Sequence, residues 1–141
     1  MKIQRFEFNL FGVNTYIIYD ADSHEAAVVD PGMTDARECE AIDSFISSNS
    51  LTIKYLINTH MHIDHLFGDE YIAKKYGTGI SASTDDSILS ERIAEQARMF
   101  HLRTDMPDSL NVDMPLHDGD RLMLGAEPID VLAVPGHSPG S

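Results

Sequence analysis

The chain has 141 residues, of which 43% are hydrophobic, so it is large enough to bury the core of one domain. Lys and Arg number 10 against 23 Asp and Glu, which gives a formal net charge of −13. A surface this acidic repels phosphate backbones and anionic membranes, and therefore argues against a nucleic-acid or membrane partner.

Nothing in the sequence predicts export or membrane insertion. There is no apolar run of about 18 residues, the length that a membrane-spanning helix needs. The first residues lack the apolar stretch and cleavage site of a secretory signal. The single cysteine, Cys39, excludes an internal disulfide framework. We therefore expect a cytoplasmic protein, and the absence of repeats and linkers predicts one domain over residues 1–141.

The first half of the chain predicts strands interleaved with a helix. Thr15–Tyr19 and Ala26–Asp30 are short β-branched and apolar runs separated by a polar loop, which is typical of a hairpin. A helix is expected to begin at Asp35, where Glu38 follows three residues on as in a capping box. Apolar residues then recur at helical spacing until Asn49 and Ser50 end the helix.

The same patterns continue along the rest of the chain and indicate an α/β fold class. The elements predicted from them are a buried strand at Leu51–Ile57, a helix at Phe67–Tyr76 closed by Gly77, a strand at Gly79–Ser83, one long helix at Asp85–His101, and strands near Arg121–Leu124 and Ile129–Val134.

The segment Thr59-His-Met-His-Ile-Asp-His65 follows the buried strand directly. Imidazole nitrogens and carboxylate oxygens are the ligands that zinc accepts in proteins. His60 and His62 are two residues apart, so both rings project to the same side of an extended segment and can chelate one ion. Asp64 and His65 follow where the chain must turn, and their side chains can reach a second ion.

A further histidine, His137, stands in a Pro-Gly-His-Ser turn after another apolar run. It completes a three-histidine set with His60 and His62, an arrangement that leaves one tetrahedral position free for water. We expect the two loops, Thr59–His65 and Gly136–Ser138, to meet at one edge of the domain.

The other polar candidates are expected to be structural. His24 lies in a hairpin loop, His101 ends a predicted helix and His117 adjoins a turn, so each is expected at the surface. Ser138 has no base at a recognisable spacing, which argues against a serine nucleophile.

These motifs resemble those of the metallo-β-lactamase superfamily, whose signature is His-x-His-x-Asp-His followed by a Gly-His loop. The resemblance extends over nearly the whole chain. It implies a four-layer αββα sandwich, of which this chain covers the N-terminal half and the start of the second half. In the family, the aspartate that matches Asp30 supports the metal site without binding the ion. From the residues alone, Asp30 at a strand end could accept the second N–H of a ligand histidine.

Two smaller features resemble those of the glyoxalase II (hydroxyacylglutathione hydrolase) branch. They are the position of His65 directly after Asp64 and the sequence Pro-Gly-His-Ser-Pro-Gly around His137. This resemblance implies a metal-dependent hydrolase of small-molecule thioesters such as acyl-glutathione, in which hydroxide on the metal attacks the carbonyl. It implies one or two zinc ions, with iron or manganese as alternatives. His60, His62 and His137 would hold the first ion, and Asp64 and His65 the second. Asp64 is also expected to have a catalytic role, accepting a hydrogen bond from the nucleophile.

In one respect the sequence departs from the family. A bridging aspartate and a final histidine follow the Gly-His loop in the superfamily, and neither can be matched here. We therefore expect a domain truncated at its C-terminus, with an incomplete second metal site and little thioesterase activity from residues 1–141 alone. Uncovered sheet edges and apolar surface would favour a homo-oligomer.

Two other interpretations stay open at this point. A mononuclear iron persulfide dioxygenase shares these motifs, and one iron per chain with oxygen uptake would distinguish it from the hydrolase. The chain could also be an inactive metal-binding fragment, as the unmatched downstream ligands suggest.

Overall fold

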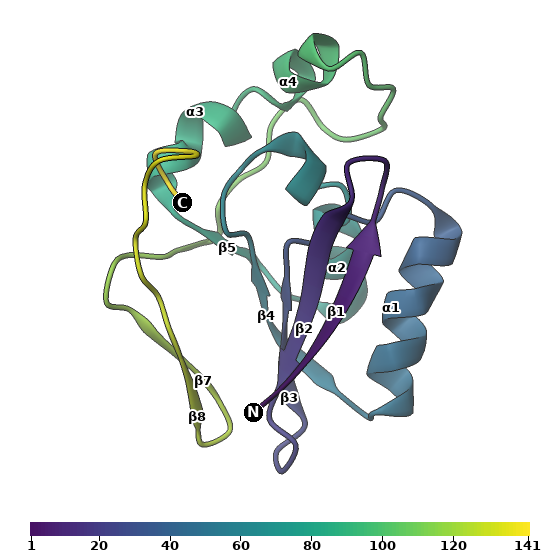
Figure 1. Cartoon of the computed structure of the whole chain (residues 1–141), viewed down its shortest axis with the longest axis vertical. Coiled ribbons are helices and arrows are strands. Elements are labelled where there is room, and N and C mark those ends of the chain that lie inside the picture. The colour runs from purple at the N-terminus through teal and green to yellow at the C-terminus, as the bar shows by residue number, and fades with distance from the viewer.

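A six-stranded sheet with strand order β1-β2-β3-β4-β5-β6 forms the centre of the computed structural model, which describes residues 1–141 (Figure 1). The first three strands pair antiparallel, and β3 to β6 pair parallel. The bounds of these strands are β1 Lys2–Phe8, β2 Val13–Tyr19, β3 Glu25–Val29, β4 Thr52–Ile57, β5 Ile80–Ala82 and β6 Met114–Pro115.

Helices and a second, two-stranded sheet cover this central sheet. Helices α1 (Ala36–Ser48) and α2 (Asp69–Tyr76) lie on one face, whereas the β7 (Arg121–Leu124) and β8 (Glu127–Asp130) hairpin lies against the other (Figure 1). Two shorter helices, α3 (Ser87–Ser90) and α4 (Ile93–Met99), lie beyond the carboxyl ends of the strands. The predicted α/β class is therefore confirmed.

The core is built on a row of apolar side chains that crosses the sheet beneath α1 and α2. Ile17 pairs with Val28, Val28 with Leu56, and Leu56 with Ile80, so the four side chains share one face. The first three are fully buried, and Ile80 is nearly so. Burial of an aliphatic side chain contributes roughly 1.5–3 kcal/mol, so this row stabilises the strands whose ends carry the site.

The prediction of a single helix over Asp85–His101 was wrong. The structure has a 3-10 turn at Thr84–Asp86, then α3, then α4. The break lies at Arg92, after which the amide of Ile93 donates to the carbonyl oxygen of Asp108 instead of one in the preceding turn. This hydrogen bond from a distant loop replaces the local one, and periodicity alone does not predict it.

Other predicted elements are confirmed with small changes of boundary. The predicted strand Ile129–Val134 instead begins at Glu127 and ends at Asp130, and the helix predicted from Phe67 begins at Asp69. Gly77 ends α2 in the left-handed conformation, as predicted. Strand β1 was missed, because charged residues interrupt its apolar alternation. None of the helices has both the length and the apolar character needed to cross a membrane.

Helices α1 and α2 are joined by one carboxylate. Asp43 on α1 accepts hydrogen bonds from the hydroxyl groups of Tyr71 and Tyr76 and from the ammonium group of Lys75, all on α2. Burial raises the pKa of Asp43, but the hydrogen bonds from Lys75 and the two tyrosines outweigh it and hold the pKa below its ordinary value. The charged carboxylate therefore stabilises the packing of α2, the helix that follows the site.

We expect Asp43→Ala to lower the free energy of unfolding by about 2 kcal/mol at pH 7, because three donors lose their acceptor. Since the folded-state pKa is lowered, this stabilisation is present above the unfolded pKa of about 3.9 and is lost as the pH falls through the folded value. Urea denaturation at pH 7 and at about pH 3 measures it, with Glu40→Ala, on the exposed face of α1, as the control. Equal stability of the two variants at pH 7 would contradict this role of Asp43.

Candidate metal centre

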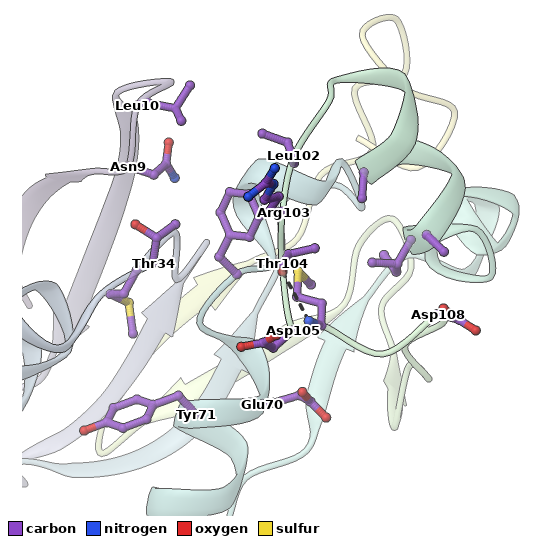
Figure 2. Close-up of a pocket in the computed structure, with 16 residues that line it drawn as sticks. Asn9, Leu10, Thr34, Glu70, Tyr71, Leu102, Arg103, Thr104, Asp105 and Asp108 are labelled. Carbon is purple, nitrogen blue, oxygen red and sulfur yellow. Dashed lines mark hydrogen bonds between the residues drawn. The ribbon is translucent and has the colours of Figure 1, made fainter.

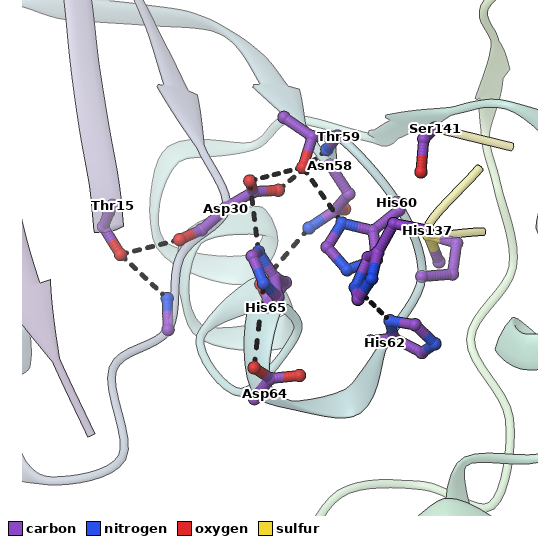
Figure 3. Close-up of polar contacts among 12 residues, drawn as sticks. Thr15, Asp30, Asn58, Thr59, His60, His62, Asp64, His65, His137 and Ser141 are labelled. Carbon is purple, nitrogen blue, oxygen red and sulfur yellow. Dashed lines mark hydrogen bonds and ion pairs between the residues drawn. The ribbon is translucent and has the colours of Figure 1, made fainter. Parts of the chain in front are cut away.

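The candidate ligands lie at the carboxyl ends of the parallel strands. The ligand loop, Thr59–His65, follows β4, and Asp30 follows the neighbouring strand β3. The His137 loop (Gly136–Gly140) comes from beyond the end of β8, and it lies against the ligand loop (Figure 3). As the sequence predicted, the two loops meet at one edge: His62 Nδ1 lies 3.0 Å from His137 Nε2.

Three histidines converge at this edge. His60, His62 and His137 each offer one ring nitrogen, and these nitrogens all lie within 4.8 Å of one another. Ligand nitrogens about 2.0–2.1 Å from a tetrahedral ion lie about 3.3 Å apart. The separation of 3.0 Å between His62 and His137 is close to that value. The three rings are therefore grouped closely enough to hold one ion once their nitrogens converge on it.

The environment of His60 leaves one of its nitrogens ready for a metal. The hydroxyl of Thr59 donates its proton to Asp30 Oδ2 at 2.6 Å, and lies 3.1 Å from His60 Nδ1. Because that hydroxyl has no second proton, Nδ1 must carry the proton of the ring and donate to it. The lone pair is then on Nε2, which is buried and has no hydrogen-bond partner in the protein. An unpaired buried acceptor is costly unless a ligand satisfies it, so the site fits a metal ion.

The pKa values of the histidines support the same conclusion. Burial, reinforced by the neighbouring His65, lowers the pKa of His60 to about 4. Burial and the adjacent His137 also lower the pKa of His62. Both rings are therefore neutral at pH 7, which is the form that binds a metal.

Of the two residues predicted to hold a second ion, His65 lies beside His60 and Asp64 lies beside His65, but neither joins the three-histidine group. The ring centroid of His65 is 4.2 Å from that of His60, and His65 Nε2 is 3.7 Å from Asp64 Oδ2. On its other side, His65 Nδ1 is 3.2 Å from Asp30 Oδ2, close enough for an ion pair although not aligned as a hydrogen bond. Burial lowers the pKa of His65, but Asp30 outweighs it and leaves the pKa above its ordinary value. Asp30 thus contacts two candidate ligands, His65 directly and His60 through Thr59.

Side chains from four parts of the fold hold the backbone of the ligand loop. Asp30 accepts from the amide of Thr59, Asp86 from that of Met61, and Gln96 from that of Ile63. The amide group of Gln96 also donates to the carbonyl of Met61, and the side chain of Asn9 donates to the carbonyl of Asp64. Apart from Asp30, these residues were missed in the sequence, because no pattern there links them to the loop.

None of the residues that the sequence marked as structural belongs to the three-histidine cluster. His24, His101 and His117 are exposed and belong to no group of potential metal ligands. Ser138 is buried, and its hydroxyl donates to Asp86 Oδ2 at 2.8 Å, which is a structural contact with a carboxylate instead of a nucleophile–base pair.

Two cavities flank this region. The larger, about 950 Å³, lies between the β1–β2 turn at Asn9 and Leu10 and the segment Leu102–Asp105, and contains none of the three histidines (Figure 2). The smaller, about 470 Å³, lies between the two sheets and reaches His60. Most of its lining surface is apolar, so the smaller cavity brings hydrophobic surface to the edge of the candidate centre.

Comparison with known proteins finds relatives that are similar in sequence and in fold. Hydroxyacylglutathione hydrolase GloC from Haemophilus influenzae is 32% identical, over 99% of this chain and 64% of its own. The crystal structure of the BLEG-1 B3 metallo-beta-lactamase superposes with a TM-score of 0.79 at 25% identity, over 99% of this chain and 65% of that one. TTHA1623, solved in a di-iron-bound form, superposes with a TM-score of 0.77 at 25% identity, over 97% of this chain and 63% of that one.

The chain thus spans a little under two thirds of the length of each of these proteins. The Metallo-beta-lactamase superfamily matches residues 8–141, which include all of the candidate ligands. This fold family implies a divalent metal, and the three converging histidines could hold one. The chain therefore belongs to the metallo-beta-lactamase superfamily.

Proposed function

We propose that this protein is a metal-dependent hydrolase of small-molecule thioesters such as acyl-glutathione. The observation that carries the proposal is the convergence of His60, His62 and His137, with a buried and unpaired Nε2 on His60. The substrate class is supported by the similarity to hydroxyacylglutathione hydrolase GloC. The formal charge of −13 disfavours the alternative of a nucleic-acid substrate.

Each residue has a role in this mechanism. His60, His62 and His137 would bind the first ion, while Asp64 and His65 would contribute to a second. A divalent ion held there would lower the pKa of its bound water to about 7. Its positive charge would also stabilise the developing oxyanion. Asp64, which lies beside His65, would accept a hydrogen bond from the attacking water and so orient it. Asp30 would keep the rings of His60 and His65 in place.

A thioester suits this arrangement of groups. The leaving thiol has a pKa of about 8.5, so it departs as a thiolate with little need for a general acid. The identity of the metal is part of the proposal: zinc is the first choice for a three-histidine site, and iron is supported by the di-iron form of TTHA1623.

We expect the metal-free protein to take up at least one zinc or iron ion, and His60→Ala to weaken that binding by more than about 100-fold. The expectation follows because loss of an outer contact alone costs 10–100-fold, and His60 would be a direct ligand. Chelator competition and elemental analysis measure the affinity and the stoichiometry. His24→Ala, which removes an exposed histidine, is the control and should bind as the wild type does. Equal affinity in all three proteins would exclude this centre.

We expect a protein of the full length of these relatives, loaded with zinc or iron, to release thiol from an acyl-glutathione, and Asp64→Asn to lower kcat by about 100-fold. The reason is that a poorly oriented nucleophile costs on the order of 100-fold in rate. Thiol release in a colorimetric assay measures turnover, and residues 1–141 are assayed beside the longer protein. Oxygen uptake with glutathione persulfide, in place of thiol release, would identify an iron dioxygenase instead. Metal binding with neither activity would indicate a metal-binding protein that is not an enzyme.

A further inference from the structure

One buried carboxylate joins the two loops that carry the candidate ligands. Asp86 is fully buried and lies in the 3-10 turn that follows β5. Its Oδ2 accepts from the amide of Met61 at 3.0 Å and from the hydroxyl of Ser138 at 2.8 Å. Its Oδ1 accepts from the amide of Gly140 at 2.7 Å. All three partners are neutral donors, so hydrogen bonds, and no ion pair, connect Asp86 to the two loops.

The partners of Asp86 are covalent neighbours of the histidines. Met61 lies between His60 and His62 in the chain, and Ser138 follows His137 directly. We infer that Asp86 is a positioning residue that sets the separation of His62 from His137, and thereby the affinity of the three-histidine site for a divalent cation. This inference rests on the proposed metal site and extends it to a residue that touches neither the ion nor the substrate.

The packing around Asp86 shows that the His137 loop is fitted to it. A side chain on Gly140 would place its Cβ 2.7 Å from Asp86 Cγ and 2.9 Å from the Asp86 amide nitrogen. Only glycine therefore allows the Gly140 amide to approach the carboxylate. The segment beyond β8 belongs to no strand or helix, so side-chain contacts such as those of Asp86 help to fix the position of the His137 loop.

A carboxylate is needed here for a chemical reason. Three donors point at two oxygens, so both oxygens must accept. In asparagine, one of these oxygens becomes an NH₂ group, which would face the N–H of either Met61 or Gly140. Asp86→Asn therefore keeps the shape of the side chain but releases one of the two loops. Gln96, by contrast, bonds to the ligand loop but not to the His137 loop, so it cannot set the distance between the two loops.

The experiment compares four proteins: wild type, Asp86→Asn, Ser138→Ala and Asp85→Asn. Asp85 is exposed and adjacent, and its side chain accepts no hydrogen bond, so Asp85→Asn makes the same change of charge without touching the loops. Zinc affinity is measured by chelator competition, and the coordination of cobalt by its visible absorption. We expect Asp86→Asn to weaken zinc binding by about 10–100-fold and to alter the cobalt spectrum, with Asp85→Asn like the wild type. Ser138→Ala removes one of the three hydrogen bonds and should weaken binding by a smaller factor.

A second readout needs no metal. In the metal-free wild type, the rings of His62 and His137 are close enough to give a nuclear Overhauser contact, and we expect Asp86→Asn to lose it. A folded Asp86→Asn that keeps this contact and binds zinc as tightly as Asp85→Asn would overturn the inference, even if its melting temperature is lower. If Asp86→Asn does not fold, wild-type affinity in Ser138→Ala overturns it. Failure of the wild type to bind any metal would refute the proposed function, while the ring contact would still test Asp86.

Discussion

Buried backbone groups must find hydrogen-bond partners, and the ligand loop has few within itself. It connects β4 to α2 without pairing with a strand, and its own hydrogen bonds are those of a short 3-10 turn, such as that from the amide of His65 to the carbonyl of His62. Side chains of Asp30, Asp86, Gln96 and Asn9 supply the missing partners. These four residues belong to four different parts of the fold, so the geometry of the centre depends on all of them being in place together.

This requirement explains features of the fold that otherwise look irregular. The break between α3 and α4 leaves the carbonyl of Leu89 without its usual helical donor, and the side chain of Gln96 donates to it at 2.9 Å. The same amide group then reaches the carbonyl of Met61. Asn9, which adopts a positive φ of 54° at the β1–β2 turn, points its side chain inward at Gly32 and Asp64. Each departure from regular structure thus directs a polar side chain towards the loop.

The features of the site that depend on neighbouring residues could be predicted from the sequence. The contacts between residues far apart in the sequence could not. The spacing of His60 and His62, the glycine that ends α2 and the alternation in β4 are signals carried by neighbouring residues. Asp86 resembles any acidic residue in the first turn of a helix, and Gln96 any polar residue on a helix. Their roles follow from contacts with Met61 and Ile63, far away in the sequence, which only the tertiary structure brings together.

The Thr59–Asp30 contact has a consequence for how the centre would meet its ion. With the proton of His60 held on Nδ1, the ring neither rotates nor changes tautomer before coordination. The ordering of the loop has thus been completed during folding, and little conformational entropy remains to be lost when an ion arrives. Such a centre would take up and release its metal without unfolding. The ion it carries in a cell would then be selected by which metals are available there, since the protein geometry is already set before any of them binds.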